Sequence, residues 1–131
     1  MEQKTFAEFE FEGSKNKGTI LCTSMTFLDY LLHLEWDITV SSYFQPQMKI
    51  VVDFEGSEYL AGVKLWVDYR NGKTCLVDFI DSKTEKLYSD HPELYAEIKS
   101  SCKSMNLHYR AINVADTKVL PLSWNLKFQH L

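Results

Sequence analysis

The chain has 131 residues and a mass of 15.3 kDa, which suits one domain with its own hydrophobic core and leaves little room for a second. Hydrophobic residues make up 45% of the chain and charged residues 24%, a balance that excludes the polar, highly charged class of disordered chains. The formal net charge of −4 argues against a protein that wraps DNA with a surface that is basic overall, so contact with nucleic acid needs a local basic patch or a partner.

The leader, residues 1–13, is acidic and aromatic. Phe6, Phe9 and Phe11 alternate with glutamates, a pattern typical of an edge strand that augments another sheet. The leader lacks the basic stretch followed by an apolar stretch that marks a signal or transit peptide, so we expect a cytoplasmic protein. Residues 13–18, Gly-Ser-Lys-Asn-Lys-Gly, predict a flexible loop between the leader and the main domain.

A helix is predicted from Ser24, which is placed to cap its start, because apolar residues recur from there at intervals of three and four. Strands are predicted for residues 40–44 and 48–54, with a hairpin turn at 55–57. The alternating run over residues 59–69 predicts one further strand.

The Asn71-Gly72 pair is a strong hairpin signal and predicts a returning strand over residues 74–80. A second helix is predicted over residues 90–106, with proline in its first turn, and strands over 107–113 and 119–122 follow. This order predicts an α/β fold, a central mixed, mostly antiparallel sheet flanked by two helices, in a single domain that spans the whole chain.

Neither a membrane-spanning helix nor a set of disulfides or zinc ligands is expected. No apolar run approaches the roughly 20 residues that a membrane-spanning helix needs. Cys22, Cys75 and Cys102 are odd in number, far apart and without a CxxC pair, which predicts reduced, buried thiols rather than disulfides or zinc ligands.

Three stretches of the chain, in this order, carry a resemblance to a known family. They are Ser24-x-x-Phe27 followed by Leu34-Glu35-Trp36-Asp37-x-x-Val40-x-x-Tyr43-x-x-Pro46, then Tyr69–Asp78, then Asn106–Ile112. The chain resembles the N-terminal nuclease domain of TnsA-type transposase endonucleases, in the PD-(D/E)xK restriction-endonuclease-like superfamily. The resemblance covers residues 15–113 and implies a restriction-endonuclease-like core with aromatic N- and C-terminal extensions.

The resemblance implies four catalytic positions: a helix glutamate, an aspartate on one strand of a hairpin, and an acidic residue and a lysine on the other strand. Together such residues hold Mg²⁺ or Mn²⁺ and activate water. In this sequence the helix position is Phe27 and the aspartate position is Lys64, or Gly62 in another register. The (D/E)xK triplet is Asp78-Phe79-Ile80, so Asp78 alone keeps a catalytic residue type.

Pairing across the Asn71-Gly72 turn places Lys64 opposite Asp78 on the same face of the hairpin. We therefore expect a cross-strand ion pair where the family binds a divalent metal, and no cofactor. If exposed, such a pair contributes about 0–1 kcal/mol to stability.

The preferred interpretation is a catalytically degenerate TnsA-like protein, a pseudo-nuclease that acts as a binding or assembly subunit in mobile-element or phage DNA processing. We expect a protein partner held by the terminal aromatic residues and, second to it, DNA held by basic turns. The partner-binding candidates are Phe6, Phe9, Phe11, Trp124 and Phe128, and the nucleic-acid-binding candidates are Lys15, Lys17, Arg70 and Lys73.

Two alternatives stay open. One is an active Mg²⁺- or Mn²⁺-dependent DNA endonuclease in which Asp78 binds the metal and the remaining catalytic residues are relocated or supplied by a partner. The other is a small acidic regulator or inhibitor on the same scaffold, which the acidic leader and the net charge of −4 allow. Metal binding and DNA cleavage separate the first alternative from the preferred interpretation.

Overall fold

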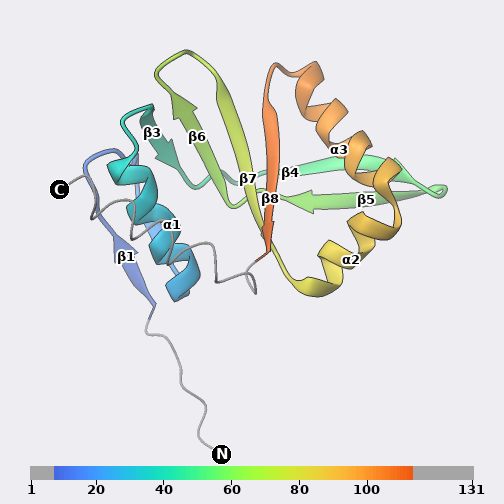
Figure 1. Ribbon diagram of the computed structural model, residues 1–131, viewed down its shortest axis with the longest axis horizontal. Helices are drawn as coiled ribbons and strands as arrows, with labels where there is room; N and C mark the ends of the chain where they lie inside the picture. The colour runs from blue at the N-terminus through green and yellow to red at the C-terminus, as the bar shows by residue number, and fades with distance from the viewer. Residues whose placement is uncertain (1–7, 114–131) are drawn as a thin grey trace, which may run out of the picture.

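The computed structural model describes residues 8–113, in which three helices and eight strands form a mixed α/β architecture (Figure 1). The elements in chain order are β1 (Phe9–Phe11), β2 (Ile20–Cys22), α1 (Met25–Trp36), β3 (Val40–Phe44), β4 (Lys49–Phe54), β5 (Ser57–Gly62), β6 (Leu65–Tyr69), β7 (Thr74–Ile80), α2 (Ser82–Asp90), α3 (Pro92–Ser104) and β8 (His108–Asn113).

A four-stranded sheet with the order β3-β6-β7-β8 forms the centre of the fold. Strands β3, β6 and β7 pair antiparallel, whereas β8 runs parallel to β7. Helices α2 and α3 make the crossover that a parallel pair requires, since a short turn cannot connect two parallel neighbours. The predicted α/β class with a mixed sheet is confirmed at this level. Strands β1-β2 and β4-β5 form two separate antiparallel ribbons.

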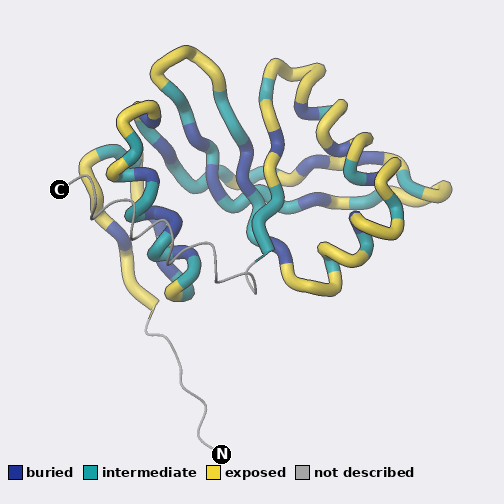
Figure 2. The backbone as a smooth tube through the Cα atoms, viewed as in Figure 1, coloured by how far each residue is buried: buried dark blue, intermediate teal, exposed yellow. Residues whose placement is uncertain are grey.

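Two hydrophobic cores lie on opposite faces of β7, because successive side chains of a strand point to opposite faces. Val77 belongs to the first core, which contains the buried side of α1, and Leu76 belongs to the second, which contains the buried sides of α2, α3 and the β4-β5 ribbon. Figure 2 shows buried positions along the central strands and exposed positions on the turns and on the outer sides of α2 and α3. The sheet therefore separates two packed layers.

Helix α1 begins where the sequence predicted. The Ser24 hydroxyl accepts a hydrogen bond of 3.1 Å from the backbone N–H of Phe27 and so caps the first turn. Phe27, Tyr30, Leu31 and Leu34 form the buried stripe of this helix.

Two element predictions are wrong. The run over residues 59–69 is not one strand, because β5 ends at Gly62 and pairs only with β4, while β6 begins at Leu65 and pairs with β3 and β7. The two predicted helices are three, since α2 precedes α3. Asp81 caps α2 by accepting a 2.8 Å hydrogen bond from the Thr84 backbone, but Tyr88 is the one buried side chain of this helix, so its apolar periodicity is weak.

The described end of the leader, residues 8–13, pairs within the chain. Strand β1 pairs antiparallel with β2, and Phe11 is buried in the first core with 7% of its surface exposed, so the prediction that Phe11 faces a partner is wrong. Phe9 keeps 40% of its surface exposed. Phe6, the predicted strand at 119–122, Trp124 and Phe128 lie outside the described residues.

The structure describes three free cysteines, of which Cys22 and Cys102 are buried and Cys75 is half-buried, which confirms free thiols and corrects the expectation of full burial for Cys75. No helix between residues 8 and 113 is long and apolar enough to cross a membrane.

Candidate functional site

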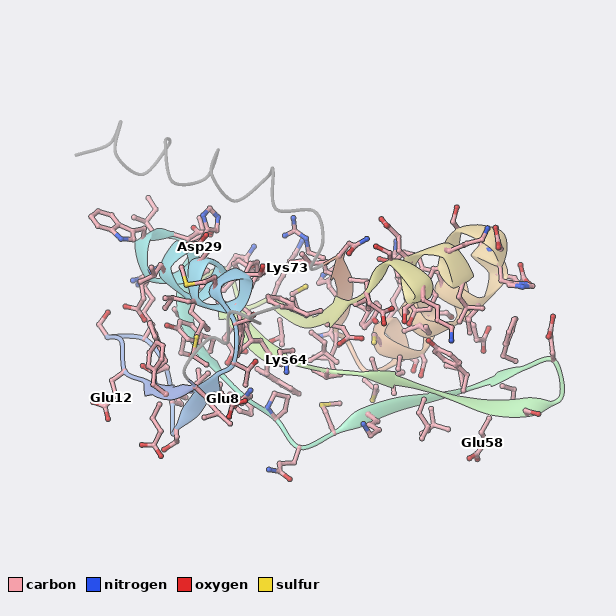
Figure 3. All side chains as sticks on the ribbon, turned by 90° about the horizontal axis from the view of Figure 1, so that it is seen from below. Glu8, Glu12, Asp29, Glu58, Lys64 and Lys73 are labelled. Carbon is pink, nitrogen blue, oxygen red and sulfur yellow. The ribbon has the colours of Figure 1, made fainter. Side chains whose placement is uncertain are left out.

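The candidate site lies at the open end of the β6-β7 hairpin, opposite its turn. Leu65 pairs with Val77, and the Lys64 backbone N–H also donates a 2.7 Å hydrogen bond to the Val77 carbonyl, so the pairing does not continue to Asp78. Lys64 and Asp78 line the same cavity, but the predicted cross-strand pair between them is wrong. In Figure 3, Lys64 lies near the middle of the molecule, between α1 and the extended β4-β5 ribbon.

The expected ion pair between Lys64 and Asp78 is not formed. The Lys64 ammonium lies 5.5 Å from the centre of the Phe27 ring, where the negative face of an aromatic ring attracts a cation. The Phe27 ring is fully buried and packs edge-on against Phe79 at 5.3 Å between ring centres. Lys64 thus contacts the Phe27 ring and lines a cavity with Asp78, while Ile80 is buried in the second core.

Asp78 is a half-buried carboxylate that is short of hydrogen-bond donors. Burial raises its pKa to about 6, because the protein replaces water that would stabilise the charge. Hydrogen bonding from Tyr109 and from the Phe79 backbone, and the positive charges of Lys64 and Lys49, act in the opposite direction. The Tyr109 hydroxyl donates to Oδ2 over 3.4 Å, which is long for such a bond.

A group of tyrosines lies behind the carboxylate, and sequence reasoning missed it. Tyr109 on β8 packs against Tyr95 on α3, which stacks on Tyr88 on α2 at 5.2 Å between ring centres. The Tyr59 hydroxyl on β5 donates a 3.1 Å hydrogen bond to the hydroxyl of Tyr88. These residues come from four elements, so no local sequence pattern predicts that they meet.

A cavity of about 580 Å³ opens beside Asp78. It is lined by residues 46–49, 62–64 and 78–79. Gly62 faces the carboxylate so closely that a Cβ atom at this position would lie 3.3 Å from Asp78 Oδ1. Lys49 is the β4 partner of Gly62, so two lysines from different elements and one carboxylate face the same space.

The Mg²⁺ or Mn²⁺ site implied by the resemblance does not fit these residues. Divalent cations of this type need several oxygen ligands, and Phe27 and Lys64 provide none. Within residues 8–113, no group of three or more histidine, cysteine, aspartate or glutamate side chains is placed to hold a metal ion. Asp78 is the one catalytic-type side chain among the four implied positions.

The predicted nucleic-acid residues do not lie together at this cavity. The Lys15 ammonium donates hydrogen bonds of 2.9 and 2.6 Å to the carbonyls of Leu34 and Asp37, so it closes the C-terminal end of α1. Arg70 and Lys73 are exposed near the turn of the β6-β7 hairpin, at its opposite end. The Arg70 Nε–H donates a 2.7 Å hydrogen bond to the Ile38 carbonyl.

Lys17, the fourth nucleic-acid candidate, is exposed, and its backbone N–H donates a 2.8 Å hydrogen bond to the Tyr43 carbonyl. This hydrogen bond joins β3 to the segment that precedes β2, and the Lys17 side chain lies at the surface. Lys17 is therefore not part of the cavity.

Glu35, in the Leu34–Asp37 stretch of the resemblance, has a structural role. It accepts hydrogen bonds from the Tyr43 hydroxyl, from the backbone N–H and hydroxyl of Ser14, and from the backbone N–H of Lys15. Although partial burial disfavours the charged form, these bonds hold the pKa of Glu35 below its ordinary value. The loop over residues 13–18, predicted to be flexible, is thus fastened to α1.

Comparison of the chain with protein-family models, with curated proteins and with solved structures gives no match.

Proposed function

We propose that this domain is a catalytically degenerate nuclease-fold protein, similar to the N-terminal domain of TnsA-type endonucleases, that acts as a binding or assembly subunit in mobile-element or phage DNA processing. The observation that carries the proposal is that Lys64 rests over the Phe27 ring and lines one cavity with Asp78. An aromatic ring and a lysine stand there in place of two metal-binding carboxylates.

The arrangement of elements supports the nuclease-like core. A capped helix is followed by the β6-β7 hairpin, and then by helices and a strand beside the second strand of the hairpin. This is the order that the resemblance implies for the elements around the active site. The DNA-processing context of the proposal rests on fold analogy, and the proposed loss of catalysis rests on the residues of the site.

The charge of the site supports a non-catalytic role. Metal-assisted hydrolysis of a phosphodiester needs carboxylates that hold a cation near the scissile phosphate. Burial raises the pKa of Asp78 to about 6, and two lysines line the same cavity. Positive charge at this place competes with a divalent cation for the one carboxylate.

Exposed apolar side chains support a protein partner. Trp36, at the C-terminal end of α1, keeps 50% of its surface exposed, and Ile38 just beyond it keeps 82%. Phe9 on β1 adds an exposed aromatic ring. Large apolar side chains on a surface are the usual anchors of protein interfaces.

Calorimetric titration of Mn²⁺ and Mg²⁺ into the purified chain, with a plasmid-nicking assay on the same sample, tests the proposal. We expect neither metal binding nor nicking. Asp78→Ala is the test variant, and Asp53→Ala, which changes an exposed carboxylate on β4, is the matched control. Metal binding and nicking that are lost in Asp78→Ala and kept in Asp53→Ala would show an active endonuclease and overturn the proposal.

A further inference from the structure

A glycine lines the cavity beside Asp78. Gly62 is the last residue of β5, and a Cβ atom there would lie 3.3 Å from Asp78 Oδ1, tighter than ordinary van der Waals contact. A side chain at position 62 would therefore crowd the carboxylate. The cavity has a volume of about 580 Å³, which lies in the range of roughly 300–1,000 Å³ of small-molecule sites.

The two lysines that line the cavity have no ionic partner in the described part of the chain. The Lys64 ammonium rests over the Phe27 ring, and Lys49 is exposed at the start of β4. The ion pairs of residues 8–113 lie elsewhere, between Lys86 and Asp90 and between His91 and Glu93. Both cavity lysines thus keep their hydrogen-bond donors available for a ligand.

The charges that face the cavity favour an anion. Two lysines and one aspartate line it. A phosphate monoester carries close to two negative charges at neutral pH, and lysine binds phosphate as a point charge. The apolar part of the lining, which includes Met48, Val63 and Phe79, suits the organic portion of a phosphate ester.

We propose that this cavity binds the phosphate group of a nucleotide or of a nucleic-acid end without a metal ion, with Lys49 and Lys64 as its cationic ligands and Gly62 as the opening. The inference rests on the proposed function, because a site that has lost its metal ligands can hold a phosphate group only through cations of the chain. The inference adds phosphate binding in the cavity to the protein binding that is proposed for the surface of the domain.

Asp78 sets a limit on the affinity. Its carboxylate interacts with Lys49 on β4, with Lys64 between β5 and β6 and with the hydroxyl of Tyr109 on β8, and it interacts electrostatically with Tyr88 on α2. An ionised carboxylate repels the ligand phosphate, and a neutral amide of the same shape does not. Asp78→Asn is therefore expected to strengthen phosphate binding at pH 8.

Calorimetry in EDTA at pH 8 tests the proposal with two probes: adenosine 5′-monophosphate and a short single-stranded oligonucleotide with a 5′-phosphate. Lys64→Gln and Lys49→Gln are each expected to weaken binding by about tenfold or more, the usual loss when a charge-assisted hydrogen bond is removed. Lys86→Gln, which removes an exposed lysine on α2, is the matched control and is expected to change little. Gly62→Val, which fills the opening, is expected to abolish binding, and a thermal melt checks that it folds.

Binding of the mononucleotide that depends on Lys49 and Lys64 supports the proposal and points to a free nucleotide. Binding of the oligonucleotide alone, with the same dependence, supports it and points to a nucleic-acid end. No binding of either probe, or equal binding by Lys49→Gln, Lys64→Gln and Lys86→Gln, overturns it. Nicking with Mn²⁺ that depends on Asp78 contradicts the proposed function instead, so the two failures are distinct.

Discussion

Glu35 and Asp78 are half-buried carboxylates in the same small fold, and they differ in the hydrogen bonds that they accept. Glu35 accepts four hydrogen bonds from the loop before β2 and from β3, and its pKa lies below the ordinary value. Asp78 accepts one long side-chain hydrogen bond, and its pKa is raised to about 6. The chain thus stabilises the charge of Glu35 and leaves that of Asp78 short of partners.

A glycine approaches each carboxylate, with opposite results. A Cβ atom on Gly13 would overlap Glu35 Oε2, so the absence of a side chain there lets the loop close directly onto the carboxylate. A Cβ atom on Gly62 would come within 3.3 Å of Asp78 Oδ1, but here the space opens into the cavity. The comparison teaches that Glu35 fastens the structure, whereas Asp78 is placed beside space for a ligand.

Removing Glu35 is expected to give the largest change. Glu35→Ala leaves the hydroxyl of the fully buried Tyr43 without its acceptor and frees the loop at Ser14. Loss of several such bonds, partly offset by water, lowers the free energy of unfolding by about 2–3 kcal/mol. Urea denaturation at pH 7 measures this effect, with Glu58→Ala on the exposed ribbon as the control (Figure 3). Equal urea midpoints for Glu35→Ala and Glu58→Ala would contradict a structural role of Glu35.

Replacing Asp78 is expected to change stability in the opposite direction. Because the pKa of Asp78 rises from 3.8 to about 6 on folding, the folded state binds more protons between pH 4 and 6, and the free energy of unfolding falls as pH rises through this window. The full difference corresponds to roughly 3 kcal/mol, and exposure of the carboxylate to water reduces it to about 1–2 kcal/mol. Asp78→Asn is expected to be more stable than the parent chain by that amount at pH 7.5.

The measurement is a series of urea denaturations from pH 4 to 8. The Asp78→Asn variant should lose the fall in stability between pH 4 and 6 that the parent chain shows. The contribution of Glu35 to the free energy of unfolding changes with pH in the opposite direction. Because the pKa of Glu35 is lowered on folding, its contribution is present above pH 4.5 and is lost as the pH falls further. A difference in stability between the parent chain and Asp78→Asn that stays constant from pH 4 to 6 would contradict the raised pKa of Asp78.

Much of the fold follows from local patterns in the sequence. The capped start of α1, the Asn71-Gly72 turn and the strand β8 all lie where periodicity and turn chemistry predict them. The division between β5 and β6 does not, because apolar alternation continues through Val63 and Leu65. The break arises from pairing with different strands, which is a property of the tertiary structure.

The candidate site was predictable only where a turn fixes the pairing. The Asn71-Gly72 turn sets the pairing of β6 with β7 as far as Leu65 and Val77, and Lys64 then lines the same cavity as Asp78. Lys49 and Tyr109 come from β4 and β8, which are far apart in the sequence, and no local pattern brings them to Asp78. The direction of the Lys64 side chain also depends on Phe27, which lies on another element. The Lys64 ammonium therefore lies over the Phe27 ring and does not form an ion pair with Asp78.

The two glycines give the finest test of the comparison. Gly62→Ala puts a Cβ atom 3.3 Å from Asp78 Oδ1, beside a cavity into which the carboxylate can shift, so the expected loss is about 0.5 kcal/mol or less. Gly13→Ala pushes against Glu35, which is fastened by its donors and cannot shift without losing them, so the expected loss is about 1 kcal/mol. Thermal melts of the two variants measure the difference. If Gly62→Ala costs more than Gly13→Ala, Asp78 is the more rigidly held carboxylate, and the open space beside it is not available to a ligand.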